Sequence, residues 1–225
     1  MLGRLEFVSG ERNRSGMEDL YGLSVLRMQT DPAGRLGKYR LSRAGATLRR
    51  SGVLRVLLPE TFCQWEILTR FGLRSVDPTP FLHFCAPELA VQGLMRRDVD
   101  PIGATVAISG NRADGDMFRA AVRLCPRVRR LVIAVPGGER LALRLREEFG
   151  IPVLPPAQPA HLELNFHPGA GRGDKRCLKL YGRRPELDGG SISFSALKEE
   201  EKGDISLLCA LWEGGKLDVE GLKFT

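Results

Sequence analysis

The chain has 225 residues, of which 43% are hydrophobic and 27% are charged, and its formal net charge is +7 at pH 7. This composition is ordinary for a globular protein. No stretch approaches the ~18 consecutive apolar residues of a membrane span, and the first residues lack the apolar core of an export signal. We therefore expect a cytoplasmic protein without a membrane span.

The number and spacing of the cysteines indicate neither a disulfide framework nor a structural zinc site. There are five of them, far apart and without a C-x-x-C pair: Cys63, Cys85, Cys125, Cys177 and Cys209. An odd number at such spacing does not fit a disulfide framework or a structural zinc site. Reduced thiols in a cytoplasm fit better, and we expect no metal.

The first third of the chain predicts two strands, a helix, a strand and a second helix. "RLEFVSG" and "YGLSVLRM" are the expected strands, with "ERNRSGMEDL" as a polar hairpin loop between them. Within 34–50, the apolar residues Leu41, Ala44 and Leu48 follow the spacing of one helix face. "GVLRVLLP" predicts a short buried strand, and "ETFCQWEILTRFG" predicts a helix that ends at Gly72.

The middle of the chain alternates helices and strands. "FLHFCAPELAVQGLMRR" predicts a helix, followed by "ATVAIS", "GDMFRAAVRLC", "RRLVIAVP", "GGERLALRLREEFG" and "IPVLPP" as strand, helix, strand, helix and strand. Near-continuously apolar strands that alternate with helices are typical of a parallel sheet covered on both faces. We therefore predict an α/β fold with a doubly wound, mostly parallel, Rossmann-like sheet over residues 1–155.

Two further features concern the domain organisation. The segments 54–78 and 130–156 share one plan, which indicates either duplicated halves (20–78 and 79–155) or a chance similarity of two βαβ units. After "PPAQPA", the segments "HLELNF", "CLKLYG" and "SISFSAL" alternate apolar and polar residues, as half-exposed antiparallel strands do. With a helix at "DISLLCALWEGG", residues 160–225 form either a β-rich α+β extension or a small subdomain.

The turn between "ATVAIS" and the next helix is the first candidate site. This stretch, over residues 100–155, resembles the first βαβ unit of a Rossmann-type domain, whose G-x-G-x-x-G turn lets the backbone approach a pyrophosphate. Only Gly110 and Gly115 are present here, and the middle glycine is missing. Asp114 and Asp116 stand at the expected helix start, where they would cap the free N–H groups and compete with a phosphate.

A second glycine turn offers a better anion site. Gly137 and Gly138 begin a helix with no acidic residue before Glu139, so backbone N–H groups are free to bind an anion. The preceding strand, however, ends without the Asp or Glu that would hold a ribose hydroxyl, which disfavours a nicotinamide cofactor. The candidate anion-binding residues are Gly110, Asn111, Arg112, Gly137 and Gly138. The alternative that these glycines only form tight turns stays open.

Little else in the sequence indicates catalysis. On "HLELNFH", alternation places His161, Glu163, Asn165 and His167 on one face, which we interpret as a solvated strand face rather than a metal site. His83 lies in an apolar helix, Cys63 follows a strand, and no G-x-S-x-G elbow is present. The basic loop "GAGRGDKR" does not have the P-loop order of residues. We assign no catalytic residue.

The whole charge excess lies between Pro32 and Pro59. This segment has seven basic residues and no acidic one: Arg35, Lys38, Arg40, Arg43, Arg49, Arg50 and Arg55. The remaining basic and acidic residues balance at 27 each. Arg43, Arg49 and Arg50 fall opposite the apolar stripe of helix 34–50, where they would contact a nucleic acid or an acidic partner. A helix side that is merely exposed to water is the simpler interpretation.

The sequence favours a cytoplasmic Rossmann-like protein without a recognisable catalytic apparatus, which binds a small anionic ligand or nucleotide near residues 109–116 and 136–139. One alternative is an NAD(P)-linked oxidoreductase with a degenerate glycine loop. Another is a nucleic-acid or protein-interaction module that uses the basic helix. The cofactor stays unassigned, and the sequence favours a binding role over an enzymatic one without deciding between them.

Overall fold

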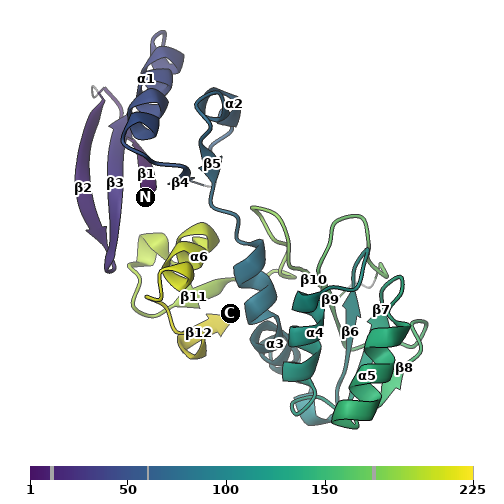
Figure 1. Cartoon of the computed structure of the whole chain (residues 1–225). Coiled ribbons are helices and arrows are strands. Elements are labelled where there is room, and N and C mark those ends of the chain that lie inside the picture. Colours follow the sequence, from purple (N-terminus) through teal and green to yellow (C-terminus); the bar gives the residue numbers. More distant parts are fainter. Residues whose placement is uncertain (11–12, 60, 174–175, 225) are drawn as a thin grey trace. The chain divides into compact units, whose positions relative to one another are not determined.

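The computed structural model of the protein describes residues 1–10, 13–59, 61–173 and 176–224, and it is a mixed α/β fold with parallel sheets (Figure 1). The chain divides into two compact units. Unit 1 consists of Met1–Asp77 with Ser206–Asp218, and unit 2 consists of Pro78–Ile205 with Val219–Thr225. Among the described residues, no helix combines the length and apolarity needed to cross a membrane.

Unit 1 is built on a mostly parallel sheet. Its described strands lie in the order β2-β3-β1-β4-β5: Arg14–Leu20, Leu23–Thr30, Leu2–Phe7, Arg55–Leu57 and Arg74–Ser75. Strand β1 pairs in parallel with both β3 and β4, and β4 pairs in parallel with β5. Only β2 is antiparallel, paired with β3 at the sheet edge.

The predicted hairpin between the first two strands is wrong. The hairpin joins β2 and β3, and β2 lies within the segment that we expected to be a loop, of which Glu11 and Arg12 are outside the described residues. Tyr21 and Gly22 form the turn, with φ angles of 55° and 83°. Two successive left-handed residues make the tight turn that matches strand twist. The turn therefore falls later in the chain than the polar loop suggested.

The helices of unit 1 are α1 (Gly37–Arg50), α2 (Trp65–Thr69) and most of α6 (Ile205–Glu213). Leu41, Ala44 and Leu48 of α1 are buried against sheet residues such as Leu5 and Met28. Helix α2 is shorter than predicted, because Phe62 does not enter it and instead stacks on Phe7 with ring centroids 5.3 Å apart.

Unit 2 contains a second sheet, in which the described strands are all parallel. Their order is β10-β9-β6-β7-β8: Cys177–Lys179, Leu162–Asn165, Thr105–Ser109, Arg130–Ala134 and Val153–Leu154. The predicted parallel pairing of "ATVAIS" with "RRLVIAVP" is confirmed, with Thr105 opposite Arg130. The antiparallel, half-exposed assignment of "HLELNF" and "CLKLYG" is wrong, since β9 is buried along its length and runs parallel to both β6 and β10.

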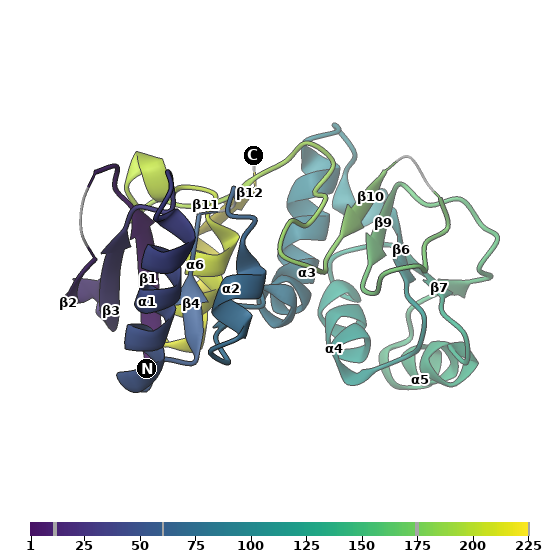
Figure 2. The same ribbon diagram turned by 90° about the horizontal axis from the view of Figure 1, so that it is seen from above.

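Helices cover one face of this sheet. Helices α3 (Thr79–Met95), α4 (Gly115–Leu124) and α5 (Glu139–Phe149) belong to unit 2, and Figures 1 and 2 show α4 and α5 on the same side of the sheet. Helix α3 faces Phe166, since the rings of His83 and Phe166 lie 4.7 Å apart. The remaining short elements are η1 (Pro101–Gly103), η2 (Glu199–Glu201), η3 (Val219–Gly221) and an antiparallel pair, β11 (Ile192–Phe194) with β12 (Leu222–Phe224).

The opposite face carries Glu163 and Asn165, because alternate residues of β9 point to opposite sides. At Glu163 the cover is an irregular segment rather than a helix, since the backbone N–H of Arg172 donates to the Glu163 carboxylate over 2.9 Å. This segment overlaps the predicted basic glycine loop, of which Asp174 and Lys175 lie outside the described residues.

The division into units does not follow the boundary expected near residues 155–160. Strand β9, which follows that boundary, lies beside β6 in the same sheet. The division falls instead between Asp77 and Pro78, next to the junction between the two segments that we considered as duplicated halves. Unit 1 also takes up Ser206–Asp218 from the far end of the chain.

Candidate functional site

The candidate site lies at the carboxyl ends of β6 and β9. From β6 the chain continues through α4 to β7 on one side, while β9 lies on the other side of β6, so the strand order reverses between β6 and β9. In open α/β sheets, ligands bind outside the carboxyl ends of the strands at such a switch point. Ser109 and Asn165, the last residues of β6 and β9, stand opposite each other here.

Glu163 places a buried carboxylate beside these strand ends. Its side chain is 0% exposed, and Oε1 accepts hydrogen bonds from the Ser109 hydroxyl and from the Arg172 backbone N–H. Oε2 is buried and has no hydrogen-bond partner among the residues that the structure describes. Burial of an unpaired carboxylate oxygen is unfavourable, so such a group within a sheet marks a candidate functional position.

His167 continues the same line of polar residues. Asn165 Oδ1 accepts the backbone N–H of His167 over 3.2 Å, and His167 Nε2 lies 3.0 Å from Oδ2 of Asp114. If Nε2 donates to this carboxylate, the neutral ring presents Nδ1 as an acceptor. That nitrogen is buried and has no partner within the described part of the chain.

The glycine turn itself holds the His167 ring. A Cβ atom on Gly110 would lie 2.6 Å from Nδ1 of His167 and would also overlap the end of Met117. Only a glycine at position 110 allows the side chains of Met117 and His167 to approach the backbone so closely. These side chains fill the space in which the predicted phosphate would contact Gly110. Asn111 and Arg112, predicted with it, are exposed.

Asp114 caps α4, as its position in the sequence predicted. Its Oδ1 accepts the backbone N–H groups of Asp116 and Met117, each over 3.0 Å. Asp116 does not act as a cap. Its carboxylate instead contacts His83 Nδ1 at 3.1 Å and forms an ion pair with Arg119. The N–H groups that a phosphate would use at α4 are thus already bonded to a carboxylate.

Asp116 has a shifted pKa, and His83 has a second polar contact. Burial raises the pKa of the Asp116 carboxyl, but the hydrogen bonds from His83 and Arg119 outweigh it, and the pKa lies below its ordinary value. The second nitrogen of His83, Nε2, lies 3.2 Å from the carbonyl oxygen of Phe166. Both partners of this ring, the Asp116 carboxylate and the Phe166 carbonyl, are hydrogen-bond acceptors.

The second glycine turn keeps its helix start free of a side-chain cap. Gly137 has φ of 69° and is exposed, and the N–H of Gly138 donates to Val135 O over 2.9 Å. No side chain caps α5 at Gly138. This arrangement does not test the predicted anion site, which stays a prediction.

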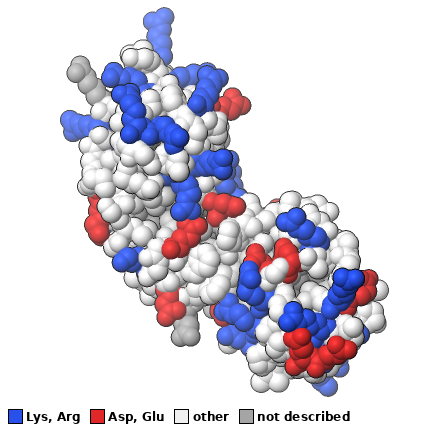
Figure 3. All heavy atoms as spheres, viewed as in Figure 1, with Lys and Arg blue, Asp and Glu red and all other residues white. Residues whose placement is uncertain are grey.

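The predicted basic residues lie on α1 in unit 1. Arg43, Arg49 and Arg50 are exposed, and Figure 3 shows Lys and Arg gathered over the part of the molecule that carries α1. Of the other predicted cations, Arg40 pairs with Asp31 and Arg55 pairs with Glu213.

Two grooves flank Tyr39 of α1. One, of about 580 Å³, is lined by residues that include Lys38 and Arg70, and the other, of about 590 Å³, by residues that include Arg40 and Arg43. The Arg43 guanidinium lies 6.0 Å from the centre of the Tyr39 ring. Cys63 lines the first groove, a position that the sequence did not predict.

Several pairings could not be read from the sequence. The Asp114–His167 and Asp116–His83 pairs join residues far apart in the chain. His161 was predicted to share a strand face with Glu163, but its ring accepts the N–H of Thr105 over 3.0 Å at the start of β6. Among the described residues, no group of three or more His, Cys, Asp or Glu side chains has the arrangement of a metal site.

No protein-family model and no curated protein sequence matches the chain. Among solved structures, the chain is similar to L-tryptophan dehydrogenase from Nostoc punctiforme, with a TM-score of 0.33 and 12% sequence identity. The match covers 64% of this chain and 44% of that chain, so the chain spans less than half the length of that enzyme. A likeness at this TM-score supports no conclusion about chemistry.

The Asp114→Ala variant should lose both the cap of α4 and the partner of His167. We expect the free energy of unfolding to fall by about 1–2 kcal/mol, the usual cost of an N-cap, in urea denaturation. The Asp114→Asn variant keeps a capping oxygen, so its free energy of unfolding should fall by less. Equal denaturation midpoints for Asp114→Ala and the wild type would show that Asp114 holds neither group.

The lowered pKa of Asp116 predicts a pH dependence. Its ionised form stabilises the fold above the ordinary carboxyl pKa, and this stabilisation is lost as the pH falls through the lowered pKa of the folded state. The wild type should therefore have a higher Tm than Asp116→Asn at neutral pH, and this difference should shrink below about pH 4. A Tm difference that stays constant down to pH 2 would contradict the assignment.

Proposed function

We propose that unit 2 is a Rossmann-like ligand-binding domain and that it binds a small polar molecule at the carboxyl ends of β6 and β9. The strand order β8-β7-β6-β9-β10 supports this proposal, since it corresponds to the order 3-2-1-4-5 of doubly wound dinucleotide-binding sheets. Five free cysteines support the cytoplasmic location that we also propose.

The observation that carries the proposal is a pair of buried polar atoms without hydrogen-bond partners at the switch point. His167 Nδ1 and Glu163 Oε2 both lack a hydrogen-bond partner among the described residues. A ligand with hydroxyl or ammonium groups supplies the donors that such atoms need. Carboxylates at Asp114, Asp116 and Glu163 disfavour an anionic group at the same position.

This site chemistry differs from that of an NAD(P)-linked oxidoreductase. A dinucleotide would need the N–H groups at the start of α4, which Asp114 caps, and the space over Gly110, which His167 fills. We therefore propose a ligand other than a dinucleotide. The start of α5, at Gly137 and Gly138, is where we would place an anionic group of the ligand, because no side chain caps it.

The Glu163→Gln variant tests this function. Replacement of a buried carboxyl group that has an unpartnered oxygen should leave the Tm of the ligand-free protein unchanged or higher. A thermal-shift panel compares two sets of compounds at about 10 mM: donor-rich ribose, glycerol and amino acids, and NAD, NADP, ATP and S-adenosylmethionine. We expect a donor-rich compound to raise the Tm of the wild type and not that of Glu163→Gln.

The control for this experiment is Glu147→Gln, which removes an exposed carboxylate from α5. Its Tm shifts should match those of the wild type. A strongly lowered Tm of ligand-free Glu163→Gln would show that the carboxylate is structural. Equal stabilisation of the wild type and Glu163→Gln by NAD or NADP would favour the oxidoreductase alternative.

The surface of α1 supports a second candidate function, the binding of single-stranded nucleic acid. The exposed cations Arg43, Arg49 and Arg50 suit phosphate groups, and Tyr39, 60% exposed between two grooves, offers a ring for base stacking. The simultaneous presence of cations, an exposed aromatic ring and grooves is what favours this function over a merely solvated helix side.

Reversal of these charges tests the second candidate. The variant Arg43→Glu, Arg49→Glu, Arg50→Glu should bind an RNA oligonucleotide at least ~10-fold more weakly than the wild type at moderate salt, and it should elute earlier from heparin. A control variant with the same change of charge carries Arg129→Glu, Arg140→Glu and Lys223→Glu, all exposed positions of unit 2. Equal loss of binding in both variants would rule out a specific role of α1.

A further inference from the structure

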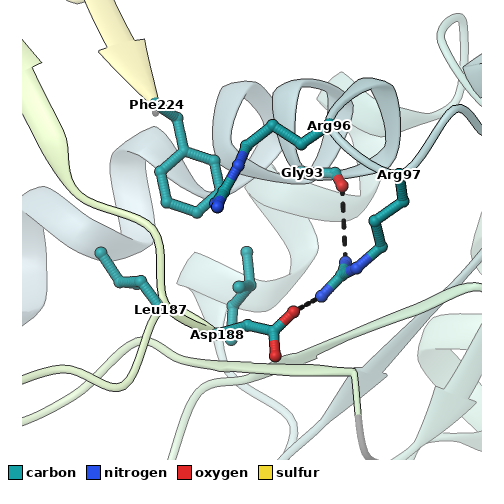
Figure 4. Close-up of a pocket in the computed structure, with 7 residues that line it drawn as sticks. Gly93, Arg96, Arg97, Leu187, Asp188 and Phe224 are labelled. Carbon is teal, nitrogen blue, oxygen red and sulfur yellow. Dashed lines mark hydrogen bonds and ion pairs between the residues drawn. The ribbon is translucent and has the colours of Figure 1, made fainter.

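A separate cavity of about 60 Å³ lies within unit 2, near the carboxyl end of α3 (Figure 4). It is formed by residues from α3, β10, β12 and the segment before β11. Its lining residues are Gly93, Arg96, Arg97, Leu178, Leu187, Asp188 and Phe224. One water molecule needs only ~10–15 Å³ of such volume, so the cavity has room for a small tetrahedral oxyanion.

Arg97 gives the cavity a partly neutralised charge. Its guanidinium forms an ion pair with Asp188 and donates to the carbonyl oxygen of Gly93 over 3.4 Å (Figure 4). The Arg97 side chain is only 19% exposed. Burial, followed by the nearby charges of Arg176 and Arg96, lowers the pKa of Arg97 below its ordinary value.

Arg96 supplies a second positive charge at the cavity wall. The Arg96 guanidinium lies 4.9 Å from the centre of the Phe224 ring, which holds it at the cavity wall. Gly190 leaves room for it, because a Cβ atom there would overlap both Arg96 and Phe224. Arg96 has no carboxylate partner among the described residues. The cavity lining thus holds two guanidinium groups and one carboxylate.

We propose that this cavity binds a phosphate group, as inorganic phosphate or as the phosphate of a monoester. The planar guanidinium carries paired N–H donors that match the oxygens of a phosphate. Stacking on Phe224 restricts Arg96 in the unbound protein, so that less freedom is lost on binding. Arg97 also bonds a carbonyl oxygen in the last turn of α3, where cations are favoured, whereas Arg96 is left for the phosphate. This site is independent of the switch-point site.

Thermal shift and calorimetry with sodium phosphate, glycerol 3-phosphate and sodium chloride at equal ionic strength test the proposal on the full chain. We expect either phosphate compound to raise the Tm of the wild type by about 2–4 °C relative to chloride. Arg96→Gln should raise the measured Kd at least tenfold. Arg96 is exposed, so this variant should fold.

The control is Arg129→Gln, an exposed arginine of unit 2 outside the cavity, which should bind phosphate as the wild type does. A shift with both compounds identifies the phosphate group itself as the ligand, and a shift with glycerol 3-phosphate alone identifies a monoester. No shift beyond that of chloride would overturn the proposal. So would equal affinities of the wild type and Arg96→Gln for phosphate.

Discussion

The carboxylate of Asp114 is the group on which the arrangement of the switch point depends. One of its oxygens closes the start of α4, and the other holds the ring of His167 against Gly110. A helix start that carries its own carboxylate has fewer free donors for a phosphate, and the negative charge repels one. Asp114 thus disfavours a phosphate site at the start of α4, and it holds the His167 imidazole of the proposed polar-ligand site.

The parallel core of unit 2 was predictable because its pattern is simple. Thr105–Ser109 and Arg130–Ala134 are short apolar runs separated by a helix with one apolar stripe, and their parallel pairing follows from that alternation. The environment of strand β9 was predicted wrongly, because Glu163 and Asn165 give its sequence the alternation of a half-exposed strand. These polar side chains are buried, and local pattern does not distinguish a polar residue in water from a polar residue that a site requires.

The candidate site was predicted in part. Gly110 and Asp114 drew attention through their positions at a strand end and a helix start, which are local features. His167, Glu163 and His83 reach the same place through the pairing of β9 with β6 and the packing of α3. Such contacts join distant parts of the chain, and no spacing rule contains them. The turn at Tyr21 was not predicted for a different reason: a tyrosine rarely adopts a left-handed backbone conformation.

The discontinuous make-up of both units constrains how the protein can be made. Helix α6 belongs mostly to unit 1, where Glu213 pairs with Arg55, and the chain then returns to unit 2, where Phe224 N–H donates to Gln92 over 2.6 Å. During synthesis on the ribosome, neither unit has all its segments until nearly the whole chain has emerged. A single cut therefore cannot yield both units as intact fragments, and the two share one late step of assembly.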